Sequence, residues 1–241
     1  MQYYTLNTKV ELPGIEYFPC ASGFQVKNAF EEFNENNHKW NKILIDPPLY
    51  DHFSLISISK DGPNDCILLD FFLFAGPINP DLKSGCLISK KFKDLLSDYS
   101  LPVNTAFYPA KLLFKGRKYD YYILHTAFDY LNELNFEKST WQYSNSKYGM
   151  LDTSQGFTEL PFKVKNKSHY ISLIERNGLE SNLTLKEAYF NNFCDLMTIN
   201  DISLFAISGR LKNAIESAEI LPADLKPIEY IDFSFEDIKQ T

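Results

Sequence analysis

The chain has 241 residues, of which 44% are hydrophobic and 23% are charged, proportions that are typical of globular domains and exclude a disordered chain. Its formal net charge of −7 disfavours binding to nucleic acid or to an anionic membrane and would attract a basic partner, although an acidic surface that keeps the protein soluble is the simpler explanation. The length favours a single α+β domain over residues 1–241, with a candidate subdivision near residues 76–80.

The first third of the chain predicts short strands separated by turns. Apolar and β-branched residues favour strands at residues 2–6, 42–45, 53–59 and 66–74. Between the first two of these, apolar residues at helical spacing predict an amphipathic helix over residues 25–33.

The clearest helix lies at residues 89–99, where Ser89 can accept a hydrogen bond from an N–H of the first turn. One face of this helix carries the apolar residues Phe92, Leu95, Leu96 and Tyr99. Two β-rich runs follow at residues 106–114 and 119–128, and Lys-Gly-Arg-Lys at residues 115–118 predicts a hairpin turn between them. We therefore expect mainly antiparallel sheet in the middle of the chain.

Residues 130–156 lack strong periodicity, so we expect irregular structure there, with one strand around residues 141–143. Beyond this region the pattern predicts a strand at residues 160–164 and a short helix at residues 168–176. A late strand is predicted at residues 228–235.

Two distant segments of the chain are similar to each other. LISKKFKDLL at residues 87–96 aligns with AISGRLKNAI at residues 206–215, and both are followed by Leu-Pro and a β-rich stretch. Each segment consists of an apolar strand end, a serine cap, a basic first turn and an amphipathic helix. The similarity indicates a repeated strand-helix-strand unit, and chance likeness between two capped helices is the alternative.

The cysteines and the N-terminal residues bear on the compartment of the protein. The four cysteines include no Cys-x-x-Cys pair, which favours buried free thiols in a reducing compartment: Cys20, Cys66, Cys86 and Cys194. The first residues lack a basic region followed by an apolar run, and no apolar stretch reaches about 18 residues. We expect a cytoplasmic protein that does not engage a membrane.

No familiar catalytic, metal or nucleotide motif occurs in the sequence. The four histidines lack metal-ligand spacing, and glycine-rich phosphate loops and the Gly-x-Ser-x-Gly motif are missing, so we expect no cofactor. His125 lies in an apolar run, where a hydrogen-bonded structural histidine is the simplest interpretation. Asp51 and His52 are neighbours that could form a general-base pair, although a polar turn explains them more simply.

The end of the chain combines acidic and aromatic residues. Glu229, Tyr230, Asp232 and Glu236 lie within or beside the predicted last strand, which would gather them near one edge of a sheet. These four residues are the candidates for contact with a cationic partner, and a solvated strand face is the alternative.

Three segments together resemble a known protein family. They are SGCLISKKFKDLL at residues 84–96, FYPAK at residues 107–111 and YYILH at residues 121–125. They are similar to immunity family 11 of bacterial polymorphic toxin systems, in which a serine-capped helix precedes a Phe-Tyr-Pro or Phe-Phe-Pro strand and a tyrosine-rich strand. In that family an acidic-to-serine segment and a second serine-capped helix follow, which correspond here to residues 129–139 and 205–215. The resemblance covers roughly residues 80–235.

The resemblance implies a non-enzymatic immunity protein that binds and neutralises a cognate antibacterial toxin, and it supplies no functional residues. Two alternatives follow from the residues. One is a hydrolytic enzyme whose site assembles only in the fold, with Asp51, His52 and His125 as its first candidates. The other is a structural or scaffold protein that has no toxin partner.

Overall fold

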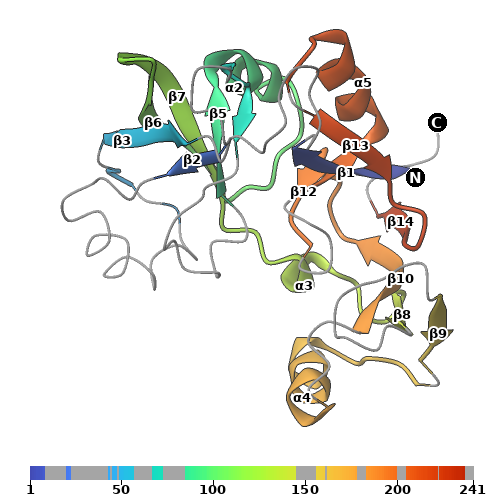
Figure 1. The fold of residues 1–241 in the computed structure, drawn as a ribbon. Coiled ribbons are helices and arrows are strands. Elements are labelled where there is room, and N and C mark those ends of the chain that lie inside the picture. The colour runs from blue at the N-terminus through green and yellow to red at the C-terminus, as the bar shows by residue number, and fades with distance from the viewer. Residues whose placement is uncertain are drawn as a thin grey trace.

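The structure is a computed structural model that describes residues 1–8, 20–22, 43, 45–47, 49–56, 67–72, 85–144, 156–160, 162–177, 183–199, 205–221 and 223–236. In these ranges the chain forms four helices and fourteen strands, and most strand pairs are antiparallel (Figure 1). The predicted α+β class is confirmed.

The largest sheet has six strands in the order β2-β3-β6-β7-β5-β4. They are β2 (Cys20–Ser22), β3 (Tyr50–Ile56), β4 (Phe71–Phe72), β5 (Gly85–Ser89), β6 (Thr105–Phe114) and β7 (Arg117–Thr126). Helix α2 (Lys90–Leu96) follows β5, and the Phe92 N–H donates to the predicted cap, Ser89 Oγ, at 3.1 Å. The predicted hairpin joins β6 to β7, with Lys115 at φ 47° and Gly116 at φ 76°, the left-handed conformations that a two-residue type I′ turn requires.

The second sheet has four strands in the order β11-β12-β1-β13. They are β1 (Tyr3–Thr8), β11 (Leu196–Met197), β12 (Phe205–Ser208) and β13 (Ala223–Pro227). Helix α5 (Gly209–Ser217) follows β12, and Leu211 N–H donates to the cap oxygen of Ser208 at 3.3 Å. The N-terminal strand β1 therefore lies between two strands from the end of the chain.

The third sheet, which we call the accessory sheet, has the order β14-β10-β8-β9. Its strands are β8 (Thr140–Ser144), β9 (Phe157–Glu159), β10 (Leu183–Phe190) and β14 (Asp232–Phe235). Figure 1 shows helix α4 (Lys167–Asn177) at the bottom of the view and helix α3 (Tyr130–Glu133) nearer its middle, with the strands of this sheet at the lower right. Strand β14 pairs in parallel with β10, whereas β10 pairs in antiparallel fashion with β8.

The first two sheets contain a repeated unit. The first unit comprises β4, β5, α2, β6 and β7, and its strands have the order β4-β5-β7-β6. The second unit comprises β11, β12, α5, β13 and β1, in the matching order β11-β12-β1-β13. The cross-strand pairs of β5 with β7 have equivalents between β12 and β1. In that order of units, Ser89–Tyr121 corresponds to Ser208–Tyr3, Ile88–Tyr122 to Ile207–Tyr4, and Cys86–Leu124 to Phe205–Leu6. The repeat predicted from the sequence is confirmed, but the last strand of the second unit comes from the N-terminus.

Side-chain contacts repeat along with the strands. The hydroxyl of Tyr121 donates to the carbonyl of Leu69 at 2.7 Å, one residue before Asp70. In the second unit the hydroxyl of Tyr3 donates to the carbonyl of Cys194, one residue before Asp195. The lysine–aromatic contacts match as well, with Lys93 over Tyr122 and Lys212 over Tyr4. These contacts would not coincide if the two capped helices resembled each other by chance.

Two aspartates join the units by a reciprocal exchange of hydrogen bonds. Asp70 accepts from the Leu221 N–H at 3.1 Å, and its own N–H donates to the Leu221 carbonyl at 2.6 Å. Asp195 makes the same two bonds with Ser100, at 2.8 and 2.6 Å. Each aspartate also accepts a 2.5 Å hydrogen bond from the cap serine of its own unit. Each one therefore ties the helix cap of its unit to the chain that follows the helix of the other unit.

Buried side chains from both units form one shared core, which stabilises their association through the removal of apolar surface from water. Its members include Leu6, Phe71, Ile88, Phe92, Leu124, Leu196, Phe205, Ile207, Leu211 and Ile215. A second cluster lies within the six-stranded sheet and a third lies under the accessory sheet. Cys86 and Cys194 are free and buried, as the sequence predicted for its thiols.

Several predicted elements differ from the structure. The strand predicted at residues 160–164 is wrong, because β9 ends at Glu159 and Val164 is buried in a segment that leads into α4. Burial in a core, rather than a strand, explains the apolar pattern there. Strand β14 is shorter than the predicted residues 228–235, and β4 is the only strand in residues 67–72, the described part of the predicted strand at 66–74. Residues 43 and 45 lie outside strands, and residues 25–33 and 76–80 lie outside the described residues.

Candidate partner-binding surface

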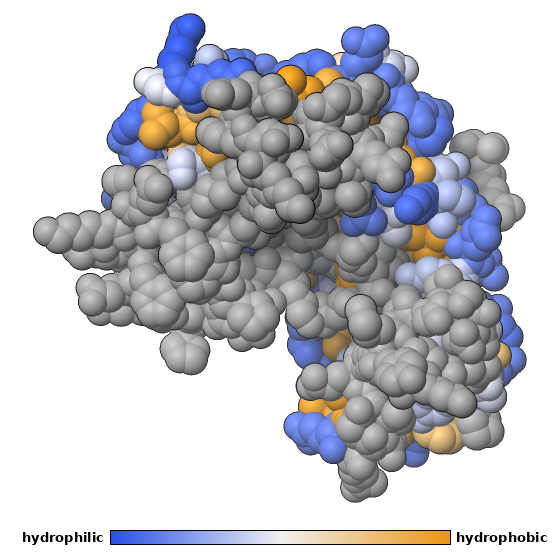
Figure 2. Space-filling view, viewed as in Figure 1, coloured by the Kyte–Doolittle hydropathy of each residue, from blue (hydrophilic) through white to orange (hydrophobic). Residues whose placement is uncertain are grey.

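The accessory sheet buries one face, whereas its other face is exposed at Glu159, Glu187 and Asp232 and buried at Gln142, Ser144 and Thr184. Its inward side chains belong to the third core, where Trp141 lies 4.8 Å from Tyr170 of α4 between ring centroids. Successive residues of a strand point to opposite faces, so the residues between the buried ones point outward. We call this the outward face, and it includes Thr140, Glu159, Asp232 and Ser234. Lys186 and Glu187 both belong to it, because a β-bulge between Leu185 and Glu187 interrupts the alternation in β10. Figure 2 shows hydrophilic residues along the right-hand edge of the molecule, beside the accessory sheet.

Two carboxylates face each other at the centre of the outward face. Glu187 and Asp232 are directly opposite in the parallel pairing of β10 and β14, and both are exposed. The hydroxyl of Thr140 donates to Glu187 at 3.0 Å, but neither carboxylate forms an ion pair within the described part of the chain. Like charges opposite each other destabilise a sheet, so this pair does not serve the stability of the fold.

A lysine on the same strand lies beside this carboxylate pair. The ammonium of Lys186 donates to Glu159 at 2.7 Å. This bond and the charge of Glu159 raise the pKa of Lys186. The charges of Glu187 and Asp232 raise it further, which indicates that all three carboxylates act on this one cation.

A second lysine occupies the other end of the outward face. Lys138 donates to Glu236 at 2.9 Å, and its nitrogen lies 4.3 Å from the ring centroid of Tyr189. The hydrogen bond between them raises the pKa of Lys138 and lowers that of Glu236. Because both groups are solvent-exposed, water screens their attraction and the pair contributes little to stability.

An aromatic pair borders the carboxylates near β9. The ring of Tyr230 stacks on that of Phe157, with centroids 5.5 Å apart. Beneath them the amide of Gln142 donates to the carbonyls of Leu185 and Tyr230, at 3.2 and 2.8 Å. Gln142 thereby satisfies backbone groups at the bulge between Leu185 and Glu187 and fixes the approach of β14 to β10.

The structure places the four candidate residues at different points. Asp232 lies at the centre of the outward face, Tyr230 at its aromatic border and Glu236 at its far end. Glu229 is exposed and forms no side-chain hydrogen bond or ion pair with this group in the described residues, so it is not part of the site as we define it.

Lys186 and Glu187 were not among the candidates because no strand was predicted at residues 183–190, and Glu159 was not among them because β9 was not predicted either. The run LTLKEAYF begins with alternating apolar and polar residues and ends in two aromatic residues, a pattern that could have revealed this strand.

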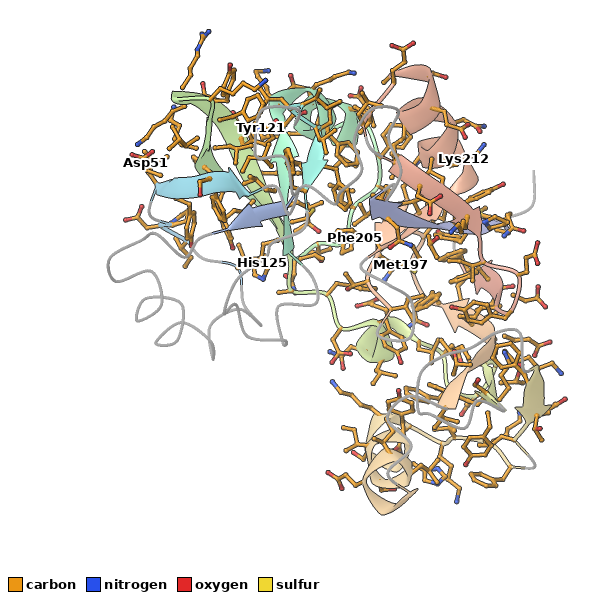
Figure 3. All side chains as sticks on the ribbon, viewed as in Figure 1. Asp51, Tyr121, His125, Met197, Phe205 and Lys212 are labelled. Atoms are coloured by element: carbon orange, nitrogen blue, oxygen red, sulfur yellow. The ribbon has the colours of Figure 1, made fainter. Side chains whose placement is uncertain are left out.

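The fold does not bring together Asp51 and His125, the two candidates for hydrolysis whose side chains the structure describes (Figure 3). Both carboxylate oxygens of Asp51 lie 2.7 Å from the ammonium of Lys118, whereas the buried His125 is 2.9 Å from the hydroxyl of Tyr108 through Nδ1. Figure 3 shows Asp51 and His125 at separate places on the six-stranded sheet. The side chain of His52 lies outside the described residues. No group of three potential metal ligands occurs where the structure describes the chain.

Comparison with known proteins finds no protein family whose model matches the chain and no curated protein that matches it. Across the described ranges, no helix has the length and apolar character needed to cross a membrane.

Proposed function

We propose that the chain is a bacterial immunity protein that binds and neutralises a cognate toxin in the cytoplasm. The observation that carries this proposal is the outward face, where exposed carboxylates lie beside the half-buried ring of Tyr230, which also packs against the third core. Aromatic side chains with a polar border are typical of surfaces that bind proteins. The resemblance of roughly residues 80–235 to immunity family 11 supports a toxin as the partner.

Neutralisation by binding requires complementary surfaces and no catalytic group. The net charge of −7 and the carboxylates of the outward face favour a toxin with a basic surface, because opposite charges accelerate and orient the encounter of two proteins. Such association weakens as salt is added, since salt screens exposed charges.

Co-expression with the product of the neighbouring gene tests this function. We expect the two proteins to co-purify as a stoichiometric complex, and we expect the chain to restore the growth of cells that express that product. Separate elution of the two folded proteins, together with no rescue of growth, would refute the proposal. A neighbouring product that is harmless to cells would favour the scaffold alternative.

A further inference from the structure

The repeated unit separates the accessory sheet from the rest of the protein. Elements α3, β8, β9, α4 and β10 lie in the chain between the end of the first unit and β11 of the second, and β14 follows the second unit. Among the described elements, none of these has an equivalent in either unit. The outward face is therefore not part of the fold that the two units share, and its residue types need another explanation.

The centre of the outward face keeps an arrangement that costs stability. Glu187 and Asp232 repel each other across β10 and β14, and Lys186 directs its hydrogen bond to Glu159 instead. A neutral residue at either position would remove the repulsion without disturbing the core, because both side chains point to solvent. A cation supplied from outside would also remove it, and would gain attraction from both carboxylates.

We propose that the outward face docks a lysine- or arginine-bearing segment of a partner protein, with one cationic side chain between Glu187 and Asp232. Only the identity of that protein as a toxin rests on the proposed function. Half-buried rings lie at both ends of the carboxylate pair, Tyr189 on one side and Tyr230 on the other. Lys138 lies over one ring and Phe157 stacks on the other, so the remaining exposed parts of both rings offer apolar contacts to the residues that flank the docked cation.

Lys186 is an internal competitor for the docked cation. Its ammonium already interacts with Glu159 and lies within the field of the two central carboxylates. A partner cation must therefore share this field with it, and removal of the Lys186 charge should tighten binding. The effect of removing Lys186 should therefore be opposite to that of removing Glu187 or Asp232.

Binding of a fluorescent decalysine peptide tests the docking site without the toxin. The double variant Glu187→Gln, Asp232→Asn should bind this peptide about threefold to tenfold more weakly than the unmodified chain. The control is Asp94→Asn, Glu216→Gln, which removes the same charge from two exposed acids on α2 and α5 and should bind like the unmodified chain. Equal weakening in both double variants, no weakening in either, or no binding by the unmodified chain would overturn the inference.

Lys186→Met keeps the length of the side chain, removes its charge and should bind decalysine about threefold more tightly. Unchanged or weaker binding would also overturn the inference, and this arm holds even if a double variant fails to fold. The neighbouring gene product is then titrated against the same proteins. If the product does not bind but decalysine shows the expected pattern, the toxin function is wrong and the docking site stands. If the product binds all variants equally, the docking site is wrong and the toxin function stands.

Discussion

Removal of the Asp195 carboxylate should destabilise the protein more than removal of the equivalent Asp70 carboxylate. Asp195 is fully buried and accepts hydrogen bonds from the Ser100 N–H, from the Ser208 hydroxyl and from two nitrogens of Arg210, with Nε at 2.6 Å. Asp70 accepts from two donors, and its nearest cation, Lys91, lies 3.7 Å away. The two sites are equivalent by position but unequal in hydrogen bonding.

The magnitudes follow from these partners. Removal of one member of a buried ion pair costs about 3–5 kcal/mol. The lower end of this range applies to Asp195→Ala, because the Arg210 side chain is 59% exposed and water can solvate its charge once the carboxylate is gone. We therefore expect the free energy of unfolding to fall by about 3 kcal/mol. Asp70→Ala removes two hydrogen bonds and a more distant ion pair, and should cost about 1.5 kcal/mol.

Urea-induced unfolding, followed by circular dichroism, measures both losses from the shift in the free energy of unfolding. Asp224→Ala is the matched control, because its ion pair with Lys226 at 3.1 Å is on the surface and its loss should cost under about 0.5 kcal/mol. A cost for Asp195→Ala that does not exceed the cost for Asp70→Ala would refute the reasoning. So would a cost for Asp195→Ala that equals the control.

Three further predictions concern other parts of the structure. Tyr3→Phe and Tyr121→Phe each remove the hydroxyl that donates to an equivalent backbone carbonyl, and each should lower the free energy of unfolding by about 1–2 kcal/mol. If the two losses, measured by unfolding in urea, differ by more than about 1 kcal/mol, the two contacts are not equivalent. Burial raises the pKa of the Cys194 thiol from 9.0 to about 11, so between these pH values only the unfolded chain ionises it. The free energy of unfolding should therefore keep its full contribution from this thiol below pH 9.0 and fall as the pH rises toward 11. The variant Cys194→Ala should show a smaller fall in the urea midpoint over this range, and an identical fall would contradict this cause. Asp232→Asn should raise the free energy of unfolding by a few tenths of a kcal/mol, since the repulsion of Glu187 is lost; a lower melting temperature would contradict that account.

Elements with local causes could be predicted from the sequence. Ser89 and Ser208 each accept a hydrogen bond from an N–H three residues later, and Lys115-Gly116 adopts the left-handed pair of the hairpin turn. Each of these features depends on residues within one or two turns of chain, so the residue types alone indicate them. The strand predicted at residues 160–164 was wrong because apolar residues that enter a core from a loop resemble a short strand.

Only part of the candidate site could be predicted from the sequence. Asp232 and Tyr230 were picked out by their alternation with apolar residues, but their neighbours Glu187, Glu159 and Phe157 come from other strands. Which residues lie opposite each other depends on strand pairing and register, and a chain with several strands has many alternative pairings.

The sequence by itself determined the α+β class, the two serine-capped helices and their similarity, because these features depend on hydrogen bonds and apolar periodicity between residues that are close together in the chain. Only the tertiary structure decided that β1 completes the second unit, that Asp70 and Asp195 each bind the opposite unit, and that Glu187 lies opposite Asp232. The partners in these contacts are far apart in the chain, and shared burial of apolar surface brings them together rather than any local preference.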